Sequence, residues 1–387
     1  MDYELIAAII FYVVVILLIY IFRKKFEIQG KIIALYRMKL GITLMDRIAK
    51  RFPRSVHVFA MTGIIVGFIG MIAIIALLIF GVYTSLFVPD APPTVAPVLP
   101  GLPIPGSPIR IPLVSGLLAI FIVAAVHEFC HGVVARRYNY VVKNTGIVFF
   151  GPIVGAFVEP DEKTLIRAPA KHQLAIYAAG SFSNIVIGAL GIALLLLVFF
   201  PLGASFVENK GITVLSVVDN FPAEKAGLQV EDVITHVNGK PIQSREEFSA
   251  MLEKISPGEA ITISTKRGDF PLTTTTKPTG DGAYIGITLT NAIEIKESLS
   301  SYKWLLSGFF WILSFIQLLV IISLGIGLFN LAPLGPIDGG RMLLTALGIF
   351  MEKERAQTIW KNVSIALLLI LALNFIPFFK AVIFAIF

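Results

Sequence analysis

The chain has little of what soluble and disulfide-bonded proteins depend on. A single cysteine among 387 residues excludes an internal disulfide framework and a zinc site built from cysteines. Only 15% of the residues are charged and 56% are hydrophobic, with a mean hydropathy of +0.84. This composition is typical of an integral membrane protein with a minority of soluble sequence. The net charge of +7 does not indicate nucleic-acid binding, because the basic residues concentrate beside apolar segments and mark topology.

Apolar runs, by contrast, are abundant. Those long enough to cross a bilayer as helices lie at about residues 5–22, 57–80, 112–136, 175–202, 304–329 and 363–379. We expect the first to be a retained anchor, because it lacks leading basic residues and a small-residue cleavage site. The block from Arg23 to Arg54 holds ten Lys or Arg residues and two acids, which places it in the cytoplasm. The proline-rich residues 81–111 are expected to form an extended external loop, and a lid over a site is an open alternative.

The third apolar run carries the sequence HEFCH, from His127 to His131. Two histidines with this spacing lie on one helix face, and Glu128 between them can reach a water held at a metal. Counting back from Arg136 places His127 roughly 13 Å inside the membrane boundary. Ionisable groups at such depth are costly unless a metal, a cavity or partners compensate them. The alternative is a helix end whose polar residues surface among headgroups. Cys130 is expected to pack as a small apolar residue.

Polar residues in later apolar runs extend this picture. Residues 145–162 are apolar but broken by glycines and Pro152, which predicts a hairpin or re-entrant loop near the metal. Asn184 follows in GSFSN, where its amide suits an oxyanion or a substrate backbone, and a plain interhelical hydrogen bond is an equal alternative. Asp338 lies in NLAPLGPIDGGRM after the fifth run and can supply a third ligand from a broken helix. A loop with Asp338 capping the next helix is the simpler alternative.

Residues from about 205 to 297 have a different character. ITVLSVV alternates as a strand, ITISTKR and FPLTTTT follow, and REEFSAMLEKI has helical periodicity. This pattern predicts a soluble domain inserted between two membrane spans. Because successive spans alternate in direction, the domain is expected outside the cytoplasm.

Together these motifs resemble a known family. HEFCH, GSFSN and NLAPLGPIDGG look like the three signatures of the site-2 protease family of intramembrane zinc metalloproteases, and residues 220–242 are similar to PDZ domains. The resemblance implies one zinc ion bound by His127, His131 and Asp338, with Glu128 as catalytic base. It also implies that Asn184 and Asn330 lie near the scissile peptide.

The same resemblance concerns two further features. Thr145 to Val158 resembles the family's re-entrant β element, which is proposed to pair with an unwound substrate. One departure from the family pattern is Ser181, which stands where proline is frequent.

The predicted fold is therefore an α-helical polytopic membrane protein with about six transmembrane helices, a re-entrant β-hairpin and an inserted PDZ-like α+β domain. Its expected parts are two N-terminal helices with their loops, a first part of the protease core, the PDZ-like domain, and a second part of the core. They cover residues 1–111, 112–203, 204–298 and 299–387.

The predicted function is zinc-dependent cleavage of a transmembrane segment of a membrane-anchored substrate. Expected partners are that substrate, peptide ends at the PDZ-like domain and the lipid bilayer, with no nucleic acid. The expected location is the cell membrane, with the active site near the cytoplasmic face and the PDZ-like domain outside. The alternative is a non-proteolytic scaffold or chaperone with a structural metal, although a structural metal does not require the base Glu128. A metal transporter would need polar residues along several helices.

Overall fold

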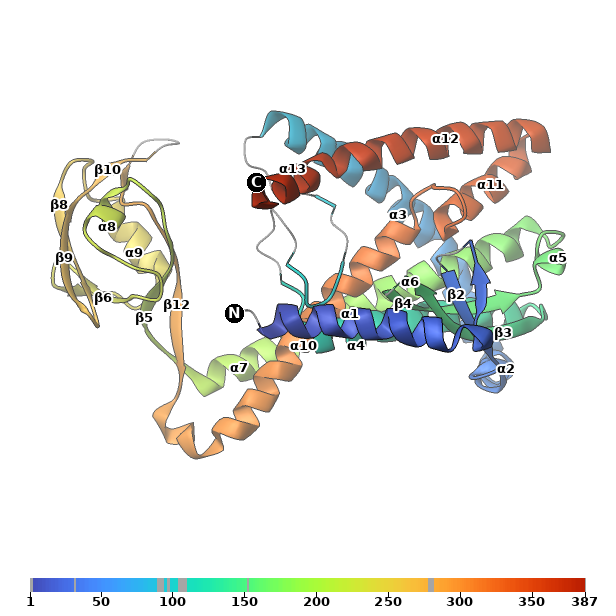
Figure 1. The fold of residues 1–387 in the computed structure, drawn as a ribbon, viewed down its shortest axis with the longest axis horizontal. Helices are drawn as coiled ribbons and strands as arrows, with labels where there is room; N and C mark the ends of the chain where they lie inside the picture. The colour runs from blue at the N-terminus through green and yellow to red at the C-terminus, as the bar shows by residue number, and fades with distance from the viewer. Residues whose placement is uncertain are drawn as a thin grey trace. The chain divides into compact units, whose positions relative to one another are not determined.

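The computed structural model describes residues 3–30, 33–88, 94–95, 98–103, 110–151, 153–277 and 282–386. They form two compact units, drawn as ribbons in Figure 1. The first unit comprises Met1–Leu195 and Leu313–Phe387, and the second comprises Leu196–Ile312.

Within the described residues, six helical segments are long and apolar enough to cross a membrane. They are Tyr3–Ile21 (α1), Pro53–Phe87 (α3), Leu113–Arg137 (α4), Ala170–Phe206, Glu297–Asn330 and Lys353–Lys380. The fourth joins α6 (Ala170–Leu194), a π-helical turn (Leu195–Phe199) and α7 (Phe200–Phe206). The fifth contains a 3-10 turn (Glu297–Tyr302) and α10 (Lys303–Asn330), and the last joins α12 (Lys353–Asn374) to α13 (Ile376–Ile386). The prediction of a polytopic membrane protein is confirmed.

The proline-rich segment is only partly described. Its first residues continue α3 as far as Phe87, because nothing in the sequence breaks the helix before Pro89. Much of the predicted extended conformation falls on residues 89–93, 96–97 and 104–109, which lie outside the described residues.

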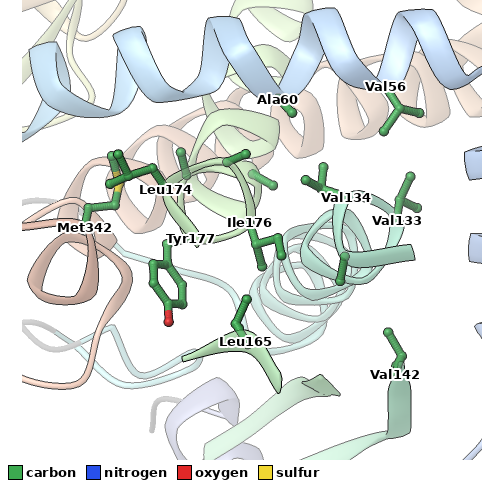
Figure 2. Close-up of a cluster of buried hydrophobic side chains, with 14 of the residues drawn as sticks. Val56, Ala60, Val133, Val134, Val142, Leu165, Leu174, Ile176, Tyr177 and Met342 are labelled. Atoms are coloured by element: carbon green, nitrogen blue, oxygen red, sulfur yellow. The ribbon is translucent and has the colours of Figure 1, made fainter. Parts of the chain in front are cut away.

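The core of the first unit lies where α3, α4, α6 and α11 (Asp338–Phe350) meet. Figure 2 shows side chains from these four helices directed into one space, among them Ala60, Val134, Ile176 and Met342. Small residues permit this close packing in a membrane, where lipid competes with apolar side chains. A side chain at Gly67 of α3, for example, would meet the Met342 methyl group at 2.7 Å. The helices that carry the polar motifs are thereby held against one another.

A four-stranded antiparallel sheet lies beside these helices, in the order β1-β2-β3-β4. Strands β3 (Val142–Phe150) and β4 (Ile153–Pro160) form the hairpin that the sequence predicted, although Pro152 in its turn lies outside the described residues. Strands β1 (Glu27–Gln29) and β2 (Ile33–Met38) come from the N-terminal block that was expected only as a basic loop. The expectation of a loop was incomplete, because the block contains these two strands and also a helix, α2 (Ile42–Arg51).

Side chains tie the N-terminal strands to the hairpin. Arg37 on β2 donates from Nε to Oε2 of Glu159 at 3.0 Å, and the amide of Asn144 donates to the same oxygen at 3.0 Å. Thr145 donates to the carbonyl oxygen of Leu40 at 2.8 Å. The sheet therefore joins the N-terminal region to the strand that lies nearest HEFCH.

The second unit contains a PDZ-like sheet in the order β12-β5-β6-β8-β9, with β7 paired to β6. Its strands are Val207–Val217 (β5), Val233–Val237 (β6), Lys240–Pro241 (β7), Ala260–Thr265 (β8), Gly268–Thr273 (β9) and Ile287–Ile295 (β12). Short helices Pro222–Lys225 (α8) and Arg245–Leu252 (α9) and the strand pair Thr275–Thr276 (β10) and Ala283–Tyr284 (β11) complete it. Ser244 caps α9 by accepting from the backbone N–H of Glu247 at 3.2 Å, as its sequence position favours.

Candidate metal centre

Three side chains from two helices converge on one point. His127 and His131 lie one turn apart on α4, and their Nε2 atoms are 3.1 Å apart. Oδ2 of Asp338, the first residue of α11, lies 3.1 Å from Nε2 of His127 and 3.3 Å from Nε2 of His131. The side chains are 7%, 12% and 16% exposed, so this cluster is largely screened from solvent.

These separations fit a tetrahedral metal ion. Zinc binds imidazole nitrogen and carboxylate oxygen at about 2.0–2.2 Å, which separates neighbouring ligand atoms in a tetrahedron by about 3.3 Å or slightly more. The three observed distances of 3.1, 3.1 and 3.3 Å lie close to this value. Two imidazoles and one carboxylate are also a typical ligand set of a catalytic zinc, which keeps a further position open for water or substrate.

Contacts at the Nδ1 atoms, on the side of each ring away from the common point, orient the two imidazoles. Nδ1 of His131 donates to the carbonyl oxygen of Ile176 at 2.6 Å, which leaves the lone pair of Nε2 facing the common point. Nδ1 of His127 lies 3.1 Å from the side-chain amide nitrogen Nδ2 of Asn184, which is fully buried. A metal on Nε2 would keep the proton of His127 on Nδ1, and turning the amide by 180° would then bring its oxygen Oδ1 to accept that proton. As placed, Oδ1 has no hydrogen-bond partner in the described part of the chain, which favours the turned amide.

Gly180 on α6 provides the space in front of the two histidines. A Cβ at this position would lie 2.6 Å from Nε2 of His127 and closer still to Nε2 of His131. A side chain there would therefore intrude on the atoms proposed to hold the metal. The GSFSN segment thus supplies both the close approach at Gly180 and the polar contact from Asn184.

Glu128 lies beside this point and contacts the hairpin. Its Oε2 accepts a hydrogen bond from the backbone N–H of Val158 on β4 at 2.9 Å. Its carboxylate and the Nε2 or Nδ1 atoms of His127 and His131 lie within 4.8 Å of one another. Because Oε2 is held by the backbone, Oε1 is the oxygen available to a water between the histidines.

Asp338 is held by a contact that the sequence did not reveal. The fully buried hydroxyl of Ser181 donates to Oδ2 of Asp338 at 3.3 Å. Asp338 is the first residue of α11 and not its N-cap, which is Ile337. The backbone of Gly339 packs so closely on the carbonyl of Leu331 that a Cβ would overlap it, which explains the glycine after Asp338. The carboxylate is therefore directed to the histidines rather than to the helix terminus.

Two further residues from the sequence motifs, Asn330 and Cys130, complete the set of candidates. Asn330 is half-buried at the end of α10, and its role near the scissile peptide stays a prediction. Cys130 is half-buried and, among the residues that the structure describes, does not belong to the potential metal cluster.

Comparison with known proteins identifies the family of this site. The model of "Peptidase family M50" matches residues 115–371, which include every residue of the cluster. The chain belongs to peptidase family M50. This confirms the resemblance to site-2 proteases. The chain is a zinc metalloprotease and a multi-pass membrane protein.

This M50 peptidase is also similar to individual known proteins, one of which is named a putative zinc metalloprotease. An uncharacterised protein of Methanocaldococcus jannaschii is 28% identical over 335 residues, which are 84% of this chain and 81% of the relative. A putative zinc metalloprotease of Clostridium perfringens is 24% identical over 314 residues, covering 62% of this chain and 89% of the relative. The PDZ domain of an SdrC-like protein from Listeria monocytogenes is 29% identical, covering 21% of this chain and 88% of that structure with a TM-score of 0.20.

Proposed function

We propose that this M50 peptidase is an intramembrane endopeptidase that cleaves a transmembrane segment of another protein with one zinc ion bound by His127, His131 and Asp338. The observation that supports this proposal most directly is the convergence of three potential ligand atoms from α4 and α11 within 3.1–3.3 Å of one another. A polar cluster of this kind needs compensation in a membrane, and a metal ion supplies it.

The proposed reaction assigns different roles to the neighbouring groups. Zinc, when bound, polarises the peptide carbonyl and lowers the pKa of a water toward about 7. Oε1 of Glu128 accepts the proton of the attacking water and delivers it to the leaving nitrogen. The Val158 N–H, which holds Oε2 at 2.9 Å, fixes the direction of this carboxylate. Asn184 and Ile176 orient the histidines, and we propose that Asn330 contacts the substrate near the scissile bond.

A helical substrate must become extended before its peptide bonds can react. Strand β4 forms an edge of the described sheet, and it runs beside α4 past Glu128. Addition of an unwound substrate segment to this edge would replace the hydrogen bonds that the substrate helix loses. We propose that β4 presents the substrate to the base in this way.

Charge distribution supports an orientation in the membrane. Arg136 and Arg137 end α4, and Arg136 pairs with Asp46 on α2, in the basic N-terminal block. Basic residues concentrate on the cytoplasmic side of membrane proteins. We propose that the site opens toward the cytoplasm in the cell membrane. The PDZ-like domain then lies outside the cytoplasm, where it binds peptide ends by strand addition.

The test replaces the base and keeps the ligands. Glu128→Gln protein and wild type are purified in parallel, and each is assayed for zinc content and for cleavage of single-span test substrates in liposomes. We expect Glu128→Gln to retain zinc and to lose cleavage by at least about 100-fold, as for a general base. Glu162→Gln, at an exposed position, serves as the matched control and should cleave like wild type. Undiminished cleavage by Glu128→Gln would refute the mechanism.

A further inference from the structure

A second feature of the first unit lies away from the metal cluster. A cavity of about 180 Å³, partly open to the outside, is lined by apolar side chains of α1, α4 and β4 and by Pro100. They include Phe11, Tyr12, Leu117, Phe121, Ile153 and Val154. A cavity of about 150 Å³ lined by such residues accommodates benzene, so this space suits one large apolar side chain.

The cavity and the base share one face of α4. Leu117 and Phe121 line the cavity, and Phe121 precedes Glu128 by seven residues, which is close to two helical turns. From Ile120, which also lines the cavity, to Glu128 the distance along the helix axis is about 12 Å at about 1.5 Å per residue. A substrate segment bound beside Glu128 can therefore reach the cavity along this face of α4.

Strand β4 connects the same two places. Val154 lines the cavity, and the backbone N–H of Val158 donates to Glu128. Since this N–H points away from β3, the backbone groups of Val154 and Ala156 face the same open edge. Four residues of strand span about 13 Å, which agrees with the distance along α4. An added strand would therefore place its residue at the cavity about four or five positions from the residue at Glu128.

We propose that this cavity is a subsite for a large apolar side chain, Leu or Phe, of the extended substrate, four or five residues from the scissile bond. The proposal rests on the proposed function. It gives α1 a role in substrate selection, although α1 lies outside residues 115–371 that define the family. A lipid chain is the competing occupant, and the tests below distinguish it from substrate.

Polar contacts fix the wall that α1 contributes. The hydroxyl of Tyr12 donates to the carbonyl oxygen of Pro100 at 2.7 Å, so its ring can face the cavity without an unpaired polar atom. Glu4 accepts from the backbone N–H of Leu113 at 2.9 Å. Ala8 is fully buried between these two contacts. The wall is therefore positioned at three points, although only Ala8 and Tyr12 of α1 are buried.

Cleavage specificity provides the first test. The probe is a single-span Leu-Ala segment with a central Asn-Gly break in liposomes, whose scissile bond is mapped by mass spectrometry. Phe, Ala or Asp is then placed at each position within seven residues of that bond. At one position, four or five residues away, Phe should raise kcat/KM over Asp by about tenfold or more. Leu117→Trp, which fills the cavity, should abolish the preference for Phe over Ala there.

The neighbouring residue provides the matched control. Leu118 is 41% exposed and does not line the cavity, so Leu118→Trp should keep the wild-type preference. If Leu117→Trp keeps this preference, or if no position four or five residues away prefers Phe, the subsite is refuted while the peptidase function stands.

Photo-cross-linking tests occupancy without catalysis. A benzophenone amino acid replaces Leu117 or Leu118 in Glu128→Gln protein, which is irradiated with the same probe. The proposal predicts a probe adduct from position 117 at the mapped subsite residue and none there from position 118. Adducts with lipid alone, or equal probe adducts from both positions, would overturn the subsite. Failure of the wild type to cleave any probe would instead count against the proposed function.

Discussion

Replacing Gly180 with alanine should remove zinc from the site without unfolding the protein. The added Cβ would lie 2.6 Å from Nε2 of His127, whereas ordinary contact begins at 3.4 Å. The imidazole must therefore retreat by about 0.8 Å, the difference between these two distances. Metal–ligand distances hold within about 0.2 Å, so this displacement is about four times the tolerance of a zinc site.

The expected loss of zinc affinity follows from comparison with milder changes. Loss of an outer-shell hydrogen bond typically weakens metal binding by about 10- to 100-fold, and displacement of a ligand atom should exceed that range. Alanine is also the better helix former by about 1 kcal/mol, so the α6 helix itself is not expected to suffer. Zinc affinity is measured by competition with a chromophoric chelator, and folding is followed by circular dichroism.

The matched control lies on a neighbouring helix. Gly325 on α10 has open space around the position of an added Cβ, with no other heavy atom within 4 Å. Gly325→Ala should bind zinc like wild type. Zinc affinity of Gly180→Ala within threefold of the control would show that the space at Gly180 is not needed for the metal, and the geometric argument would fail.

Three further changes probe other parts of the molecule. Ser181→Ala removes the 3.3 Å hydrogen bond to Asp338 and should weaken zinc binding about tenfold in the same competition assay. In the PDZ-like unit, the hydrogen bond from Arg267 lowers the pKa of the buried Asp232, so its ionised form stabilises the fold at neutral pH. That stabilisation should be fully present above the usual pKa of about 3.9 and be lost as pH falls through the lowered pKa of Asp232, and amide exchange of wild type and Asp232→Asn should converge below that lowered pKa. Asn374→Leu removes a buried 2.9 Å hydrogen bond to an α3 carbonyl and should destabilise the membrane unit by about 1 kcal/mol in a reversible unfolding assay.

Sequence patterns were most informative where chemistry and local period coincide. The spacing of His127 and His131 defines one helix face without further information, and Glu128 follows from the motif. Residues 145–162 combine β-branched and aromatic residues with a Gly-Pro turn, and the hairpin of β3 and β4 confirms that prediction. The six apolar runs were found for the same reason, because each carries its signal within its own residues.

Long-range contacts were not accessible in the same way. Strand β1 has only three residues, all exposed, and Ile33 on β2 pairs with Phe150 far along the chain. Such short strands are defined by their partners rather than by their own composition, so the N-terminal part of the sheet was missed. The contact of Ser181 with Asp338 and the space at Gly180 also exist only because α4, α6 and α11 pack together.

The central claim is that one zinc ion lies among three ligands from two helices, and its most direct test is an anomalous-scattering map recorded at the zinc edge from crystals of the protein purified with zinc. The account predicts one peak per chain at about 2.0–2.2 Å from Nε2 of His127, Nε2 of His131 and a carboxylate oxygen of Asp338. In crystals of Asp338→Ala protein the peak should weaken strongly. A zinc peak elsewhere, or full occupancy without Asp338, would contradict the account.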